Sequence, residues 1–287
     1  MPNSTPGGEF VIGKDLRIAR LGYGAMRITG QGIWGEPKDR AEAIRVLRRA
    51  MELEINFIDT ADSYGPHVSE EIIAEALHPY PAGLVIATKG GFDRPGPNQW
   101  VENGTPEHLR SACEGSLRRL RLDRIDLYQL HRIDPKVPAD DQLGTLKDLQ
   151  AQGKIKHIGL SEVNVGQIRH AQTIVPIVSV QNRYSLADRG SEDVLEYCEK
   201  AGIGFIPWFP LAAGQLSSTN SPINRVAAQW KATPSQVALA WLLARSPVML
   251  PIPGTSSVQH LEENVAAAGL KIDQNSMREL SETALSK

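Results

Sequence analysis

The feature that most constrains this chain is an alternation of short apolar runs with helical patterns. Eight runs rich in Val, Ile and Leu are each followed by a loop and then by apolar residues at helical spacing. Strands that are apolar throughout are buried on both faces, and strands that alternate with helices form parallel sheets through right-handed crossovers. The runs that we expect to be strands are Arg20–Gly24, Asn56–Asp59, Leu84–Lys89, Ile125–His131, His157–Leu160, Ile177–Gln181, Gly204–Trp208 and Val248–Ile252.

Eight such units in a chain of 287 residues predict a closed (β/α)8 barrel, the TIM barrel. The alternative is an open doubly wound sheet, which usually has fewer strands. Before the first unit, Glu9–Ile12 and Leu16–Ala19 predict a β-hairpin that covers the bottom of the barrel. The residues after Asp273 predict one extra C-terminal helix. We expect a single domain over residues 1–287, with residues 1–8 flexible.

Local signals mark the ends of several helices. Thr105 and Thr233 each precede a proline, the pattern of an N-cap hydroxyl followed by proline in the first helical position. Ser69, followed by two glutamates, is expected to cap the second helix. Gly153 and Gly202 each follow a helical pattern, as a left-handed C-cap would.

Composition narrows the function class. Hydrophobic residues make up 41% of the chain, and 31 basic residues nearly balance 33 acidic ones. That balance argues against broad capture of nucleic acid. The longest apolar run, Val237–Ala244, is too short to cross a membrane, and Met1–Glu9 does not resemble a secretory signal. Two lone cysteines fit a reducing cytoplasm, and no metal-ligand spacing is present.

Polar side chains follow three of the expected strands. Asp59, Lys89 and His131 each end an apolar run, and Tyr64 follows Asp59 by five residues. Active sites of such barrels lie at the C-terminal ends of the strands. A neighbouring ammonium lowers the pKa of a phenol, so Lys89 could prepare Tyr64 to donate a proton to a carbonyl oxygen that His131 orients. These groups deliver protons and not electrons, so a cofactor must supply the hydride.

Each of these residues alone has an ordinary structural interpretation, as an ion pair, a core histidine or a packing aromatic. Their joint order resembles the aldo-keto reductase superfamily from about residue 18 to 270. That resemblance implies a (β/α)8 barrel that reduces carbonyls with a nicotinamide cofactor, with Asp59, Tyr64, Lys89 and His131 as catalytic residues and Tyr64 as the acid. The segments that carry it are Leu21–Met26, Asn56–Gly65, Lys89, Leu127–His131, Ile158–Ser161, Val180–Asn182 and Ile252–Gly254.

The resemblance also implies a cofactor site. Ser161 and Gln181 match positions that hold the nicotinamide carboxamide, and Trp208 matches an aromatic that stacks on the ring. The helix that opens after Gly254 would point free amides at an anion. The full set implied for the cofactor is Gly24, Ala25, Met26, Asp59, Ser161, Gln181, Trp208, Leu211, Gly214, Leu216, Gly254, Thr255, Ser256, His260, Glu263 and Asn264.

Two positions depart from the family pattern. Glu162 stands where the family usually has Asn. Gly254 and His260 stand where Lys and Arg often bind the 2′-phosphate of NADP. We therefore expect NADPH to be preferred over NADH by a smaller margin than in members that carry both basic residues.

The chain looks most similar to a bacterial branch that includes pyridoxal reductases. Trp34, Phe92 and Trp100 fall in or beside loops at the top face and, with Trp208, predict an open aromatic slot. Such a slot favours a planar aromatic aldehyde such as pyridoxal over a sugar or a steroid. We expect no nucleic-acid or membrane partner, and a monomer is favoured. The alternative function is a cofactor-binding sensor similar to potassium-channel β-subunits.

Overall fold

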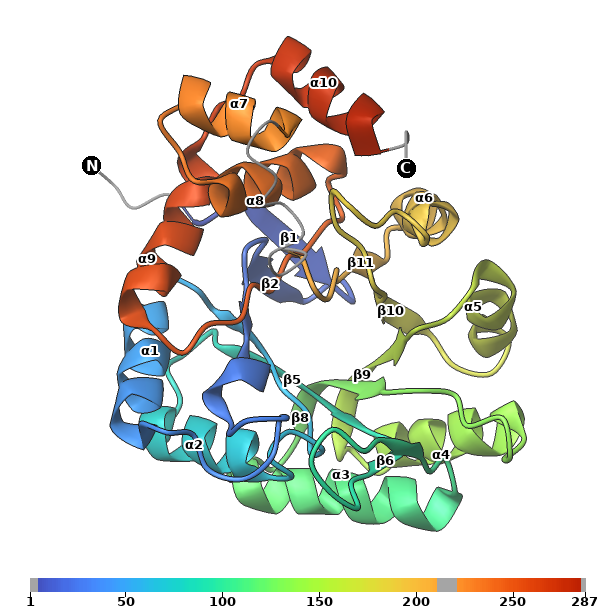
Figure 1. Ribbon diagram of the computed structural model, residues 1–287. Coiled ribbons are helices and arrows are strands. Elements are labelled where there is room, and N and C mark those ends of the chain that lie inside the picture. The colour runs from blue at the N-terminus through green and yellow to red at the C-terminus, as the bar shows by residue number, and fades with distance from the viewer. Residues whose placement is uncertain (1–4, 211–220, 285–287) are drawn as a thin grey trace.

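A parallel sheet forms the centre of the computed structural model, which describes residues 5–210 and 221–284. Seven strands are hydrogen-bonded in the order β11-β10-β9-β8-β5-β4-β3, and the sheet curls so that helices surround it (Figure 1). This arrangement confirms the predicted (β/α)8 architecture. The strands are β3 (Tyr23–Gly24), β4 (Phe57–Asp59), β5 (Val85–Gly90), β8 (Ile125–Leu130), β9 (Ile155–Ser161), β10 (Ile177–Gln181) and β11 (Gly204–Phe205).

The eighth expected strand, Val248–Ile252, is an extended segment that closes the barrel without forming a full ladder. The Phe205 amide donates to Val248 O and the Leu250 amide to Phe205 O, each at 2.8 Å. On the other side, the Gly22 amide donates to Pro251 O at 2.9 Å. Pro251 has no N–H to donate, which explains why the pairing stays so short. The segment lies where the eighth strand was predicted, but the prediction that it forms a regular strand was wrong.

Helices cover the outside of the barrel (Figure 1). The helix α7 (Pro222–Gln229) was not predicted. Nor was the short hairpin within the loop after β5, which consists of β6 (Phe92–Asp93) and β7 (Val101–Glu102). Of the helices in the described ranges, none is long and apolar enough to cross a membrane. The helices are α1 (Arg40–Glu52), α2 (Val68–Leu77), α3 (Pro106–Leu120), α4 (Ala139–Ala151), α5 (Val165–Gln172), α6 (Glu192–Ala201), α7 (Pro222–Gln229), α8 (Pro234–Arg245), α9 (Val258–Ala266) and the predicted C-terminal α10 (Gln274–Ala284).

The predicted N-terminal hairpin is present and covers the bottom of the barrel. Strands β1 (Glu9–Ile12) and β2 (Leu16–Ala19) pair antiparallel. Their buried residues Ile12, Leu16 and Ile18 form one apolar cluster with barrel residues that include Phe57 and Leu127. The β1–β2 hairpin closes the bottom of the barrel, so a ligand must enter from the opposite end.

Most of the predicted helix ends are confirmed. Thr105 and Thr233 accept hydrogen bonds from the amides three residues on, and Gly153 and Gly202 have φ of 75° and 66°. The prediction for Ser69 was wrong, because α2 begins at Val68 and its N-cap position is His67, two residues before Ser69. Ser69 instead donates to Ala25 O at 3.1 Å and pairs with the Thr60 hydroxyl at 2.8 Å. It therefore links the loop after β4 to the helix that follows.

Candidate active site

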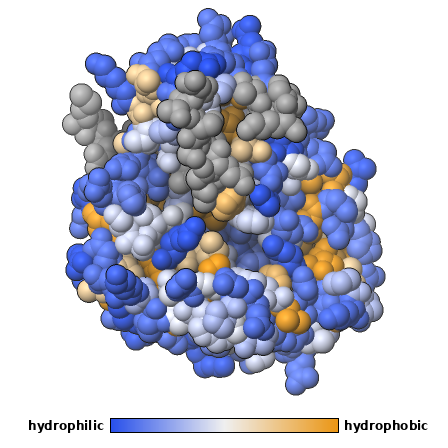
Figure 2. Space-filling model, viewed as in Figure 1, coloured by the Kyte–Doolittle hydropathy of each residue, from blue (hydrophilic) through white to orange (hydrophobic). Residues whose placement is uncertain are grey.

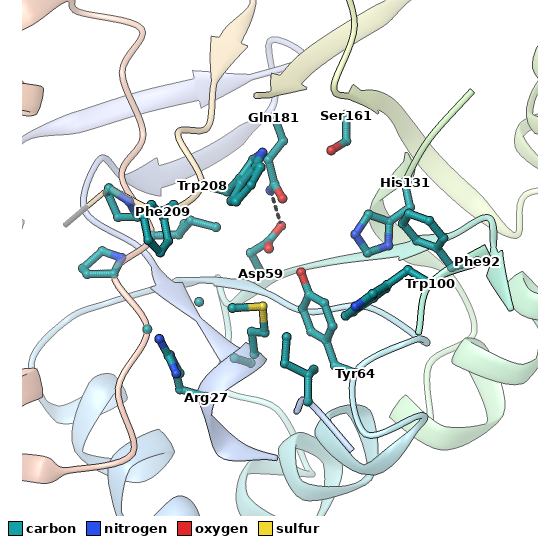
Figure 3. Close-up of a pocket in the computed structure, with 18 of the residues that line it drawn as sticks. Arg27, Asp59, Tyr64, Phe92, Trp100, His131, Ser161, Gln181, Trp208 and Phe209 are labelled. Atoms are coloured by element: carbon teal, nitrogen blue, oxygen red, sulfur yellow. Dashed lines mark hydrogen bonds between the residues drawn. The ribbon is translucent and has the colours of Figure 1, made fainter. Parts of the chain in front are cut away.

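A cavity of about 740 Å³ opens at the C-terminal ends of the strands. The face that carries it is hollowed near its centre in the space-filling view (Figure 2), and Figure 3 shows side chains from many strands pointing into it. Ligand sites commonly have this size. It is lined by Gly24, Ala25, Met26, Arg27, Ile33, Asp59, Tyr64, Phe92, Trp100, Glu102, His131, Arg132, Ser161, Gln181, Trp208, Phe209, Pro210, Ser235, Ile252, Pro253 and Gly254.

A buried ion pair lies at the floor of the cavity. Lys89 Nζ donates to Asp59 Oδ1 at 2.6 Å and to Thr60 O at 2.7 Å, and both charged side chains are almost fully buried. Asp59 Oδ2 accepts from the side-chain amides of Gln129 and Gln181, each at 2.9 Å. Burial is the largest single effect on Lys89 and opposes its charge, but Asp59 and Tyr64 together outweigh it, so the pKa of Lys89 is raised. Lys89 therefore stays a cation.

Tyr64 places its hydroxyl 3.4 Å from Lys89 Nζ. Its loop turns at Gly65, where φ is +108° and a Cβ would lie 2.5 Å from that of Val68, so only glycine fits. The sequence predicts that Lys89 lowers the pKa of the phenol. In the structure Lys89 does lower the pKa of Tyr64, but burial has the larger effect, so the pKa of the phenol is raised overall. The phenol keeps its proton at neutral pH, as an acid must.

His131 directly follows β8 and faces the same space as Tyr64, with the two ring centroids 5.9 Å apart (Figure 3). Its Nδ1 lies 3.3 Å from the Ser63 hydroxyl. Burial, followed by the charges of Lys89 and Arg132, lowers the pKa of His131 well below its usual range. The imidazole is therefore neutral at pH 7 and has one N–H, which can donate to a substrate oxygen.

Ser161 and Gln181 end neighbouring strands and present complementary groups. Gln181 directs its NH2 group to Asp59, because a carboxylate only accepts, so its carbonyl oxygen remains as an acceptor (Figure 3). The Ser161 oxygen accepts from Arg132 at 3.0 Å, which leaves the hydroxyl proton to donate. One donor beside one acceptor matches the two ends of a primary carboxamide.

Comparison with known proteins agrees with this geometry. The model of the aldo/keto reductase family matches residues 20–284. The chain belongs to this family. It is 52% identical over 285 residues to an uncharacterized oxidoreductase of Schizosaccharomyces pombe, a match that covers 99% of this chain and 92% of the relative. It is 46% identical over 263 residues to pyridoxine 4-dehydrogenase of Escherichia coli, covering 90% and 92%.

A solved structure of an aldo/keto reductase from Klebsiella pneumoniae, in complex with NADP and acetate, superposes with a TM-score of 0.82. The two proteins share 26% identity, and the match covers 96% of this chain and 95% of that chain. This protein is therefore an oxidoreductase of the aldo/keto reductase type.

In this reductase Glu162 has a role of its own. Its Oε1 accepts from the Arg183 amide at 2.6 Å and from the indole Nε1 of Trp208 at 2.5 Å. An Asn side chain is one methylene shorter than Glu and carries no charge. The carboxylate holds the indole of Trp208 at the wall of the cavity, so this departure from the family pattern fixes an aromatic that the cofactor site is expected to use.

The structure brings together only part of the predicted site. The four expected catalytic residues line or floor the cavity, as do Gly24, Ala25, Met26, Ser161, Gln181, Trp208 and Gly254 from the cofactor set and Phe92 and Trp100 from the substrate set. Trp34 is not a lining residue. Thr255, Ser256, His260, Glu263 and Asn264 lie beyond the lining, before or within α9. Leu211, Gly214 and Leu216 fall outside the described residues.

Three arginines near the cavity were not singled out in the sequence. Arg94 stacks on Trp100 with its Cζ 3.6 Å from the ring centroid, and it donates to the carbonyls of Ser63, Gln99 and Ile33 at 2.5, 2.8 and 3.1 Å. Arg27 lines the cavity close to Gly254, and Arg132 directly follows His131. The only sequence signal for Arg132 is that adjacency.

Proposed function

We propose that this reductase transfers hydride from NADPH to the carbonyl carbon of a small aromatic aldehyde such as pyridoxal, with Tyr64 as the general acid. The observation that carries the proposal is a protonated phenol at the cavity wall, 3.4 Å from the buried Lys89 ammonium and beside a neutral His131. Reduction of a carbonyl by hydride needs a proton donor for the carbonyl oxygen and is aided by an N–H that binds this oxygen, and these residues supply both.

The residues present fit a nicotinamide cofactor. When bound, NADPH supplies the hydride. The Ser161 hydroxyl and the Gln181 carbonyl would hold the carboxamide, and Trp208 would pack on the ring. The helix after Gly254 was expected to offer free amides to a phosphate, but the Val258 amide donates to Glu42 Oε1 at 3.1 Å and the His260 amide to Ser257 Oγ at 3.5 Å. The phosphate would instead rely on the Arg27 side chain, which lines the cavity beside Gly254. Support for NADPH comes also from the NADP complex of the Klebsiella pneumoniae relative.

The protein's own part in the reaction is to place and move a proton. His131 donates a hydrogen bond to the carbonyl oxygen and so orients it between imidazole and phenol. As negative charge develops on that oxygen, the proton of the Tyr64 hydroxyl moves to it and an alcohol results. The Lys89 ammonium stabilises the phenolate left behind, and Asp59 keeps that ammonium in place.

The aromatic wall supports a planar substrate. Phe92 and Trp100 pack edge to face with centroids 5.3 Å apart, and each lies within 6.2 Å of the His131 ring. The Escherichia coli relative is named for pyridoxine, the alcohol that reduction of pyridoxal yields. Both observations favour an aromatic aldehyde at this site.

A comparison of specificity constants tests the substrate. With saturating NADPH we expect kcat/KM for pyridoxal and for 4-nitrobenzaldehyde to exceed that for an aldose by at least about tenfold, because a flat apolar wall gives a sugar few hydrogen-bond partners. An aldose that outperformed both aromatic aldehydes would contradict the proposal. Activity on nitrobenzaldehyde without activity on pyridoxal would remove pyridoxal alone.

Cofactor preference gives a second test. We expect NADPH to bind more tightly than NADH. Arg27→Met and His260→Ala should each bring the two dissociation constants closer together, because each removes a side chain that is expected to contact the 2′-phosphate. Fluorescence titration with each cofactor measures both. A preference for NADH, or a ratio unaffected by both substitutions, would refute this account.

We also propose that residues 1–287 form a single domain that acts in the cytoplasm. The family match spans residues 20–284, which supports one domain. Both cysteines, Cys113 and Cys198, are buried as free thiols, which suits a reducing compartment.

A further inference from the structure

We propose that Arg132 is a binding site for an anionic group on the substrate, so that the preferred aldehydes carry a carboxylate or phosphate on the ring. This inference rests on the proposed function and narrows its substrate class. It comes from the position of the guanidinium, from its unused hydrogen-bond donors and from its lack of a carboxylate partner.

Arg132 lies at the inner part of the cavity. It follows His131 directly, is half-buried and lines the same space as Tyr64. Its Nη1 donates to His131 O at 2.6 Å and to Ser161 Oγ at 3.0 Å. These two bonds fix one end of the guanidinium against the strand ends and so hold the side chain in the cavity.

The rest of the guanidinium is available. Arginine has five N–H groups, and both bonds of Arg132 to described residues come from Nη1. The Nε and Nη2 donors, which lie along one edge in parallel, have no partner among the described residues. That edge is the fork that binds the two oxygens of a carboxylate or a phosphate.

The positive charge of Arg132 also lacks a direct partner among the described residues. No ion pair there joins it to an acidic side chain, whereas the buried Lys89 has Asp59 and Arg119 has Glu70, each at 2.6 Å. Leaving a half-buried cation without a counter-ion is costly unless a ligand supplies one. The neighbouring Arg94 bonds to backbone carbonyls and adds to the positive potential.

Two acidic residues interact with this charge at longer range, without forming an ion pair with it. Glu162, whose carboxylate accepts from the Arg183 amide and the Trp208 indole, keeps its negative charge and favours the charged form of Arg132. Glu102 lines the cavity and has a weaker effect of the same sign, because water partly screens its exposed carboxylate. Phe92 completes the site, because the Arg132 Cζ lies 5.6 Å from its ring centroid. An aromatic substrate with an acidic substituent could therefore pack its ring against Phe92 and pair its negative charge with Arg132.

The test compares matched aldehydes that differ in one charge. With wild-type protein and saturating NADPH, we expect kcat/KM for 4-carboxybenzaldehyde to exceed that for its methyl ester, methyl 4-formylbenzoate, by about 10- to 100-fold, as a charged hydrogen-bonded pair provides. Pyridoxal 5′-phosphate against pyridoxal is the second pair and tells whether phosphate is also accepted. Preference for the anion in either pair supports the proposal, and no preference in both refutes it.

Substitutions then assign the effect to Arg132. Arg132→Met should bring the anion-to-ester ratio close to one, and Arg132→Lys should keep part of it. Glu102→Gln should raise the ratio. Arg110→Met, at an exposed arginine on α3 paired with Asp148, is the matched control and should leave it unchanged. If Arg132→Met weakens NADPH binding with the ratio intact, Arg132 serves the cofactor through Ser161 and the proposal is wrong.

Binding separates this inference from the proposed function. The dissociation constants of 4-carboxybenzaldehyde and its ester are measured by tryptophan quenching on protein with NADP⁺ added. Tighter binding of the carboxylate that Arg132→Met abolishes supports the anion site even if no aldehyde is reduced, a result that would reject the proposed function alone. Equal binding of both compounds refutes the anion site whatever the activity.

Discussion

Replacing Tyr64 by phenylalanine is expected to lower kcat for aldehyde reduction by about 10²- to 10⁴-fold, the contribution of a positioned general acid. The substitution removes the proton that moves to the substrate oxygen and keeps the ring that packs beside His131 and Trp100. The dissociation constant of NADPH should change little, because Tyr64 is not among the residues expected to hold the cofactor. Steady-state kinetics and a fluorescence titration measure the two quantities.

Tyr128 provides the matched control. It is a fully buried tyrosine on β8 whose hydroxyl has no hydrogen-bond partner among the described residues, and it does not line the cavity. Tyr128→Phe should therefore retain most of the wild-type turnover. A Tyr64→Phe protein that matched this control would show that the proton comes from elsewhere.

Replacing Lys89 by methionine is expected to damage both catalysis and stability. Turnover should fall by orders of magnitude, because the phenolate formed at Tyr64 loses its neighbouring cation. The free energy of unfolding should fall by about 3–5 kcal/mol, since Asp59 is left as a buried charge without its partner. Gln129 and Gln181 still donate to the other carboxylate oxygen, which favours the lower end of that range. Urea denaturation and kcat measure the two effects.

The double variant Asp59→Asn/Lys89→Met separates these effects. Removing both charges avoids the unpaired carboxylate, so much of the lost stability should return while turnover stays low. A double variant as unstable as the single one would mean that the cost comes from packing and not from charge. Recovery of turnover in the double variant would contradict the role given to Lys89.

The sequence predicts best where one local rule places a residue. Asp59, Lys89 and His131 each end an apolar run, and parallel strands in a barrel direct those ends to one face, so their meeting follows from strand order alone. The hairpin before β3 and the helix after Asp273 follow from equally local patterns. Val248–Ile252 was predicted only in part. Its position follows from the alternation of strands and helices, whereas its short pairing depends on Pro251.

The remaining details depend on contacts between segments far apart in the chain. Trp34 was expected in the substrate slot, yet it does not line the cavity, and the Arg94 Cζ lies 5.6 Å from its ring centroid. The direction of the pKa of Tyr64 depends on how deeply the loop is buried, which a motif does not state. Arg132 follows a predicted catalytic residue, but only the structure shows that its Nε and Nη2 donors have no partner among the described residues.

Arg94 has a consequence for how this protein can diverge. Its guanidinium holds three separate segments through main-chain oxygens at Ser63, Gln99, Gly32 and Ile33. Every residue type has a carbonyl, so a change of side chain at Ser63, Gln99 or Ile33 need not break these hydrogen bonds. Of these positions, Ile33 lines the cavity. Its side chain can therefore change during evolution, and substrate specificity with it, while Arg94 still holds the backbone next to Tyr64.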